Sequence, residues 1–153
     1  FLPGFGRIRI MDIAILAPAA VLILWSLIML FWMAATRFPA MAKSGADLAK
    51  APPGGRGSDL EGVIPDKVNW KSHNYTHLME QPTLFYATVV ILALVNAGHG
   101  LNLYLAWAYA IIRIIHSIWQ ATVNLVNVRF MLFIASTVCL LIMATNALWA
   151  TLF

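Results

Sequence analysis

The chain has 153 residues, of which 61% are hydrophobic and 10% are charged, whereas about a quarter of the residues in a soluble domain are charged. A chain this apolar, with a mean hydropathy of +0.81, cannot cover itself with polar surface, which excludes a water-soluble domain and leaves lipid as its solvent. Its formal net charge is +4, and its basic residues lie mostly in one loop, so the charge indicates orientation in a membrane and not a nucleic-acid partner.

Four apolar segments are long enough to cross a bilayer, which takes about 20 residues. The first covers residues 13–36 and follows a short basic extension that precedes an expected natural start at Met11. The other three cover residues 78–97, 101–120 and 128–153. Backbone groups in lipid must pair within their own segment, so each is predicted to be a helix. We therefore predict an all-α membrane protein, a four-helix bundle that forms one domain over residues 1–153.

Residues 37–72 form the one substantial loop of this prediction, because proline and glycine recur there and both break helices. The loop also holds most of the basic residues of the chain: Arg37, Lys43, Lys50, Arg56, Lys67 and Lys71. The turn at residues 96–102 holds none. The positive-inside rule places the long loop and the connection at residues 121–127 in the cytoplasm, with both termini outside.

Polar side chains recur at helical spacing inside two of the predicted spans. Ionisable groups in a membrane are costly, and they usually face the bundle interior or a wet cavity. Four polar side chains share one face of the third helix: Tyr109, Arg113, His116 and Gln120. His73, His77 and Glu80 form a similar stripe on the second. If the two stripes face each other, Glu80 gains a cationic partner in Arg113.

Less specific interpretations of these residues stay open at this point. A Glu80–Arg113 pair can serve only to fix helix packing, and Arg129, at the start of the fourth span, can simply extend to the headgroups. His73, His77, Glu80 and His116 have a ligand-like spacing for zinc or iron. No second His-x-x-x-His motif or carboxylate pair accompanies them, and we predict no metal site.

Three motifs together resemble a known family. They are Glu80-Gln-Pro-Thr-Leu-Phe-Tyr-Ala in the second span, Arg113-Ile-Ile-His116-Ser in the third, and Arg129 at the opening of the fourth. This pattern is similar to that of the membrane-associated proteins in eicosanoid and glutathione metabolism (MAPEG), in their bacterial branch. The resemblance covers residues 74–153 in its motifs and the whole chain in its four-helix layout. It implies a bacterial inner-membrane location.

The resemblance further implies a homotrimer that binds glutathione between neighbouring subunits. Glu80 matches the glutamate that holds the glutathione amino group, and Arg113 matches an arginine that supports the site from within the bundle. His116 matches a histidine that contacts glutathione in some members. Arg129 matches the arginine credited with activating the thiol, so it is the expected catalytic residue. Arg37 is matched to a first-helix arginine by position alone.

The chain departs from the family pattern at several positions around these residues. Thr76 and His77 stand where catalytic members often carry Arg-Asn, Gln120 stands in place of a tyrosine, and Phe130 stands where a serine follows the arginine. We expect His77 and Gln120 to line the glutathione site. The expected function is a glutathione-dependent transferase or peroxidase acting on lipophilic substrates. The alternatives are a non-catalytic accessory subunit of a larger membrane complex and a lipid-binding protein.

Overall fold

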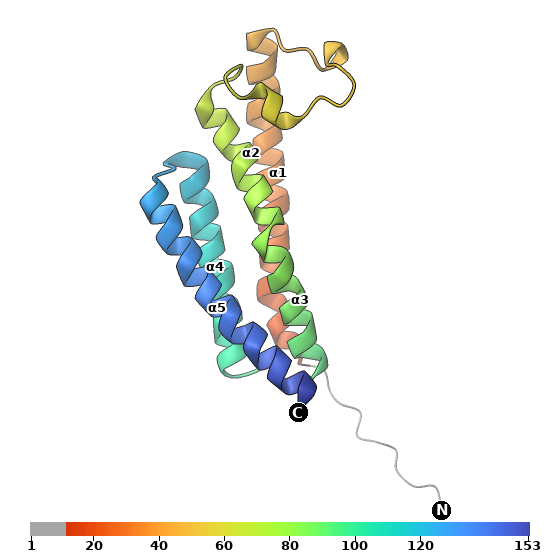
Figure 1. Ribbon diagram of the computed structural model, residues 1–153, viewed down its shortest axis with the longest axis vertical. Helices are drawn as coiled ribbons and strands as arrows, with labels where there is room; N and C mark the ends of the chain where they lie inside the picture. Colours follow the sequence, from red (N-terminus) through yellow and green to blue (C-terminus); the bar gives the residue numbers. More distant parts are fainter. Residues whose placement is uncertain (1–11) are drawn as a thin grey trace, which may run out of the picture.

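The computed structural model describes residues 12–153, and within this part the regular secondary structure is all helical, with no strand (Figure 1). The expected start at Met11 lies outside the described residues. Three short 3₁₀ turns and five α-helices follow in order: η1 Ile13–Ile15, α1 Leu16–Ser44, η2 Leu48–Lys50, η3 Gly57–Leu60, α2 Asp66–Met79, α3 Gln81–Leu94, α4 Leu101–Thr122 and α5 Val126–Leu152.

Four helical stretches are long and apolar enough to cross a membrane: Ile13–Ser44, Asp66–Leu94, Leu101–Thr122 and Val126–Leu152. They confirm the predicted all-α membrane protein with a four-helix layout. Many large apolar side chains point outward from these helices, for example Phe31 at 71% exposure and Trp149 at 69%. Such surfaces suit contact with lipid, because water would penalise so much exposed apolar area.

Helical structure extends further into the predicted loop than the composition indicated. Helix α1 continues past residue 36 and through Pro39 to Ser44. A proline removes one helical hydrogen bond, and here that loss falls near the helix end, where alanines still favour helix. Gly45 then stops the helix in a left-handed conformation (φ 74°), which glycine adopts without steric cost. The connection to α2 therefore covers residues 45–65.

The second span is made of two helices, α2 and α3, which meet at Glu80. The backbone of Glu80 is not helical (φ −84°, ψ −99°), and Pro82 follows in the first turn of α3. Proline disfavours a helical conformation in the residue before it and clashes with the carbonyl four residues back. The break is thus encoded by Pro82, and it changes the direction in which the side chain at position 80 projects.

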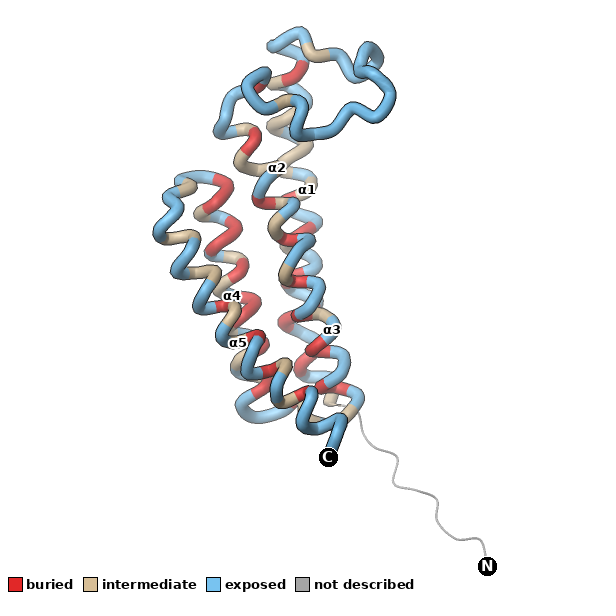
Figure 2. The backbone as a smooth tube through the Cα atoms, viewed as in Figure 1, coloured by how far each residue is buried: buried red, intermediate tan, exposed pale blue. Residues whose placement is uncertain are grey.

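The helices pack as two pairs that face each other. Helix α1 lies along α2 and α3, and α4 and α5 form a hairpin beside them (Figure 1). Buried positions follow the inward faces of the helices (Figure 2). The core includes Ile15, Leu22, Phe85, Val89, Leu92, Ala106, Tyr109, Ala110 and Met143. The connection at residues 45–65 lies at one end of the bundle, and η1 and the end of α5 lie at the other (Figure 1).

Hydrogen bonds between side chains join the helices inside the bundle. Gln81 donates through Nε2 to Thr137 Oγ1 of α5 (2.8 Å) and accepts through Oε1 from Tyr109 of α4 (3.3 Å). Asn74 of α2 donates to Ser117 Oγ of α4 (2.8 Å). Polar residues commonly connect membrane helices in this way, and these bonds fix the register of α2 and α3 against the hairpin.

Candidate functional site

The inward face of α4 carries the polar side chains that the sequence singled out. Arg113 is 1% exposed, His116 and Gln120 are 3% exposed, and Tyr109 is fully buried. Their helical spacing gives them a common face, and α4 packs that face against α2 and α5. The fold therefore brings an arginine and a histidine into the interior of the bundle, where unbalanced polar groups are costly.

The expected stripe of His73, His77 and Glu80 is divided in the structure. His73 is exposed, and its Nε2 lies 2.9 Å from Glu61 Oε1 in the connection before α2. His77 instead points inward, with its ring centroid 4.9 Å from that of His116. Glu80 is exposed at the break between α2 and α3. A helical repeat that runs into a proline break no longer predicts a common face, which is why Glu80 does not follow His77 to the inside of the bundle.

The expected Glu80–Arg113 ion pair does not form within the part of the chain that the structure describes. Arg113 donates from Nη2 to the backbone carbonyl of His77 (3.3 Å). Its guanidinium carbon lies 5.9 Å from the Tyr109 ring centroid and 5.8 Å from that of Phe133. Aromatic faces and a carbonyl thus surround the cation, and no carboxylate neutralises it.

Arg129 enters the same region from the first turn of α5. Its Nη1 donates to Asn124 Oδ1 at 2.6 Å. Asn124 lies in the short connection between α4 and α5 and has a left-handed backbone (φ 59°), which asparagine tolerates better than most residues. The tight connection therefore fixes the position of the Arg129 side chain.

Two histidines and one arginine line a cavity of about 190 Å³ at this point, and we call it the His–Arg cavity. Its lining is His77, His116, Val126, Arg129, Phe130 and Phe133. No carboxylate belongs to this lining, while imidazole and guanidinium groups offer N–H donors. The cavity is therefore suited to an anion with an apolar neighbour.

Several buried polar atoms near the His–Arg cavity have no hydrogen-bond partner within residues 12–153. They are Arg113 Nε and Nη1, Arg129 Nε and Gln120 Oε1. A buried donor without a partner costs about 1–3 kcal/mol, and more when the group is charged. An anionic ligand would neutralise these guanidinium charges. The unpaired donors are therefore a second sign of an anion site.

Arg37 lies elsewhere. Its Nη1 donates to Ser72 Oγ (2.8 Å), its Nη2 donates to the carbonyl of Gly57, and it lines a separate pocket at the end of α1. The structure thus brings together His77, His116 and Arg129, with Arg113 and Gln120 close by on α4, and leaves Arg37 and Glu80 outside this group.

In the described residues no cluster of three or more His, Cys, Asp and Glu side chains is arranged to hold a metal ion.

Sequence reasoning missed three contributors to the cavity region, Val126, Phe133 and Asn124. Phe133 follows Arg129 by one helical turn, so helical spacing along the fourth span would have identified it. Asn124 carries a weaker signal, since an asparagine between two helices suggests only a left-handed turn residue. Its bond to Arg129 depends on how the connection folds.

Comparison with known proteins places this fold and site in a family. The MAPEG family model matches residues 15–149, which covers nearly the whole chain. Comparisons with curated proteins and with solved structures gave no match. The matched region includes most or all of each of the four membrane-spanning stretches and every residue of the His–Arg cavity. The chain therefore belongs to the MAPEG family, the membrane proteins of eicosanoid and glutathione metabolism, and is an integral, multi-pass member of it.

Proposed function

We propose that the protein binds glutathione with the thiol in the His–Arg cavity and transfers it to, or uses it to reduce, lipophilic substrates. One observation carries this proposal: the cavity is lined by two imidazoles, a guanidinium and two phenylalanines, and by no carboxylate. Family membership supports glutathione as the ligand, because members generally use it.

Arg129 is proposed to stabilise the glutathione thiolate. A free thiol has a pKa of about 8.5 and is mostly protonated at neutral pH, and a neighbouring cation favours the anion. Asn124 fixes the Arg129 side chain through the 2.6 Å bond, so the charge is held in place before glutathione arrives. In a transfer reaction the thiol loses its proton to water or to an imidazole. Its sulfur electron pair then forms the bond to the electrophilic carbon as the leaving group departs.

His77, His116, Arg113 and Gln120 are proposed to bind the rest of the buried part of glutathione. Both imidazoles line the cavity, and they offer N–H donors or acceptors according to tautomer. Arg113, next to the cavity on α4, contributes positive charge, and its Nε and Nη1 nitrogens have no hydrogen-bond partner in residues 12–153. Phe130 and Phe133 give the cavity an apolar wall against which a lipophilic substrate can pack.

A neighbouring subunit is proposed to complete the site. The cavity volume of about 190 Å³ lies below the about 300–1,000 Å³ of ordinary ligand pockets, so one protomer encloses only part of the tripeptide.

Glu80 is exposed at the α2–α3 break, and no hydrogen bond or ion pair within residues 12–153 engages its carboxylate. An exposed carboxylate at membrane depth needs a partner. A homotrimer with glutathione between subunits satisfies this, with Glu80 on the glutathione amino group.

Calorimetric titration of glutathione into the detergent-purified protein tests the proposal. We expect saturable binding that Arg129→Ala and Glu80→Ala each weaken roughly tenfold or more, since hydrogen bonds to charged groups contribute about 1.5–3 kcal/mol. Arg56→Ala, in the connection before α2, serves as the matched control and should bind like the parent. Native mass spectrometry of the same samples should show three copies. Equal binding by Arg129→Ala and the parent would refute the proposed site, and a monomer with full affinity would refute the shared one.

A further inference from the structure

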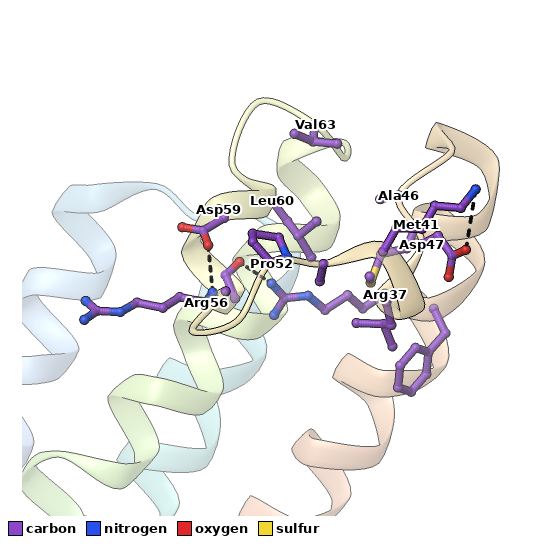
Figure 3. Close-up of a pocket in the computed structure, with 15 residues that line it drawn as sticks. Arg37, Met41, Ala46, Asp47, Pro52, Arg56, Asp59, Leu60 and Val63 are labelled. Atoms are coloured by element: carbon purple, nitrogen blue, oxygen red, sulfur yellow. Dashed lines mark hydrogen bonds and ion pairs between the residues drawn. The ribbon is translucent and has the colours of Figure 1, made fainter.

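A second and larger pocket lies between the end of α1 and the connection at residues 45–65. Its volume is about 510 Å³, within the usual range of ligand pockets. Apolar side chains of α1 and of the connection supply much of its lining, notably Phe38, Met41, Leu48, Leu60 and Val63. Figure 3 shows Arg37 reaching from α1 across this pocket toward the connection. We call it the loop pocket.

Arg37 is the cation at the centre of the loop pocket, and no carboxylate within the described part of the chain forms an ion pair with it. It contacts Ser72 Oγ and the carbonyl of Gly57, which leaves most of its five N–H groups for a ligand. The absence of a side chain at Gly57 leaves room for this approach. A Cβ added there would lie 3.0 Å from Nη2 and 3.2 Å from Nη1 of Arg37.

Both acidic residues of the pocket lining are used by the connection itself. Asp59 Oδ2 accepts from the Arg56 backbone N–H at 2.7 Å. Asp47 Oδ1 accepts from the Ala49 N–H at 2.9 Å, and its Oδ2 lies 3.9 Å from Lys50 Nζ. Arg56 also lines the pocket, and its side chain points away from Arg37 (Figure 3). Neither carboxylate therefore forms an ion pair with Arg37, whose charge lies beside the apolar side chains of the lining.

The position of the loop pocket along the chain gives access from the membrane. Arg37 directly follows the uncharged apolar segment that ends at residue 36, which places its guanidinium where a span reaches the headgroup region. An amphiphile that leaves the bilayer at this level meets the cation first and the apolar side chains of the connection beyond it. A bounded pocket of about 510 Å³ suits one chain better than the two chains of a phospholipid.

From this arrangement we propose that the loop pocket binds a single-chain lipophilic carboxylate, such as a long-chain fatty acid. Its carboxylate pairs with the Arg37 guanidinium, and its chain lies against Phe38, Met41, Leu60 and Val63. Carboxylates match the fork geometry of an arginine. The site is separate from the His–Arg cavity and goes beyond the glutathione function proposed there.

Displacement of a fluorescent fatty acid, cis-parinarate, from the purified full chain in neutral detergent tests this site. We expect palmitate to displace the probe at one equivalent per chain. Hexadecanol, with the same chain length and no charge, should be at least about tenfold weaker, because it lacks the charged hydrogen bonds. Arg37→Met should weaken palmitate by a similar factor. Leu60→Trp should also weaken it by filling the pocket.

Matched variants keep the test decisive. Lys67→Met removes a charge from the first turn of α2, outside the pocket lining, and Arg129→Met alters the other cavity; both should bind palmitate like the parent. Arg37→Lys, which retains a charge, should recover part of the affinity if Arg37→Met folds poorly. The proposal is overturned by equal binding of palmitate and hexadecanol. It is also overturned by loss of binding in Arg129→Met, or by a dipalmitoyl phosphatidylglycerol that competes better than palmitate.

Discussion

At the scale of single residues, the site depends on how one arginine is held. Arg129 lies in the first turn of α5, and Asn124 accepts its hydrogen bond from the connection before that helix. Asn124 also has the left-handed backbone that the tight connection requires (φ 59°). One residue therefore fixes both the turn and the guanidinium, and these two effects can be separated by substitution.

Asn124→Gly and Asn124→Ala make that separation. Glycine keeps the left-handed turn and removes only the bond to Arg129, so we expect weaker glutathione binding, by several-fold, with little change in thermal stability. Alanine removes the bond and also strains the backbone by about 1–2 kcal/mol, so it should lower both. Calorimetry and thermal unfolding in the same detergent measure the two effects. A glycine variant with parental affinity would show that Asn124 does not position Arg129 for the ligand.

At the scale of helices, the break between α2 and α3 has the largest effect on the site. It divides the second span at Glu80 and leaves Glu80 exposed, while His77, in α2 before the break, lies beside His116. Gln81, the first residue after the break, bonds both α4 and α5. The break is thus held in place by two hydrogen bonds to the facing hairpin.

A double-mutant cycle at Gln81 and Thr137 measures this connection. We expect Gln81→Leu and Thr137→Val each to destabilise the fold, with a coupling energy of about 0.6 kcal/mol, the average for hydrogen bonds between membrane helices. Unfolding in mixed micelles gives the free energies. The pair Thr145→Val and Gln81→Leu is the control and should be additive, because Thr145 bonds only within α5. Additive effects for Gln81 and Thr137 would contradict the bond.

Particular elements show what the sequence can and cannot predict. Hydropathy located the four spans, because lipid demands long apolar helices. The spacing of Arg113, His116 and Gln120 located the inward face of α4, because a helix repeats regularly. The stripe ending at Glu80 failed where Pro82 interrupts that repeat. The cavity partners of Arg129 depend on helix packing and on a connection whose conformation the sequence marks only by one asparagine.

At the scale of the whole molecule, charge and shape both distinguish the two ends. The connection at residues 45–65 and the loop pocket lie at one end of the bundle (Figure 1), and the basic residues gather on that side. From the positive-inside rule we propose that this end faces the cytoplasm. Both proposed ligand sites would then open toward the compartment that holds glutathione and free fatty acids.

Cysteine labelling tests this orientation in intact cells. In a Cys139→Ser background, Ser58→Cys should stay unlabelled by a membrane-impermeant maleimide until the cells are opened, because residue 58 lies in the exposed part of the connection. His99→Cys, on the exposed turn between α3 and α4, is the matched probe for the other side and should be labelled at once. The reverse pattern would place the connection outside.

The most direct test of the central claim is the ultraviolet difference spectrum of the glutathione-saturated protein at neutral pH. If Arg129 stabilises the thiolate, the parent should show the thiolate absorbance band, and Arg129→Met should lose it even when enough glutathione is added to saturate the variant. A parent without the band, or a variant that keeps it in full, would contradict the account of the His–Arg cavity as a site of thiol activation.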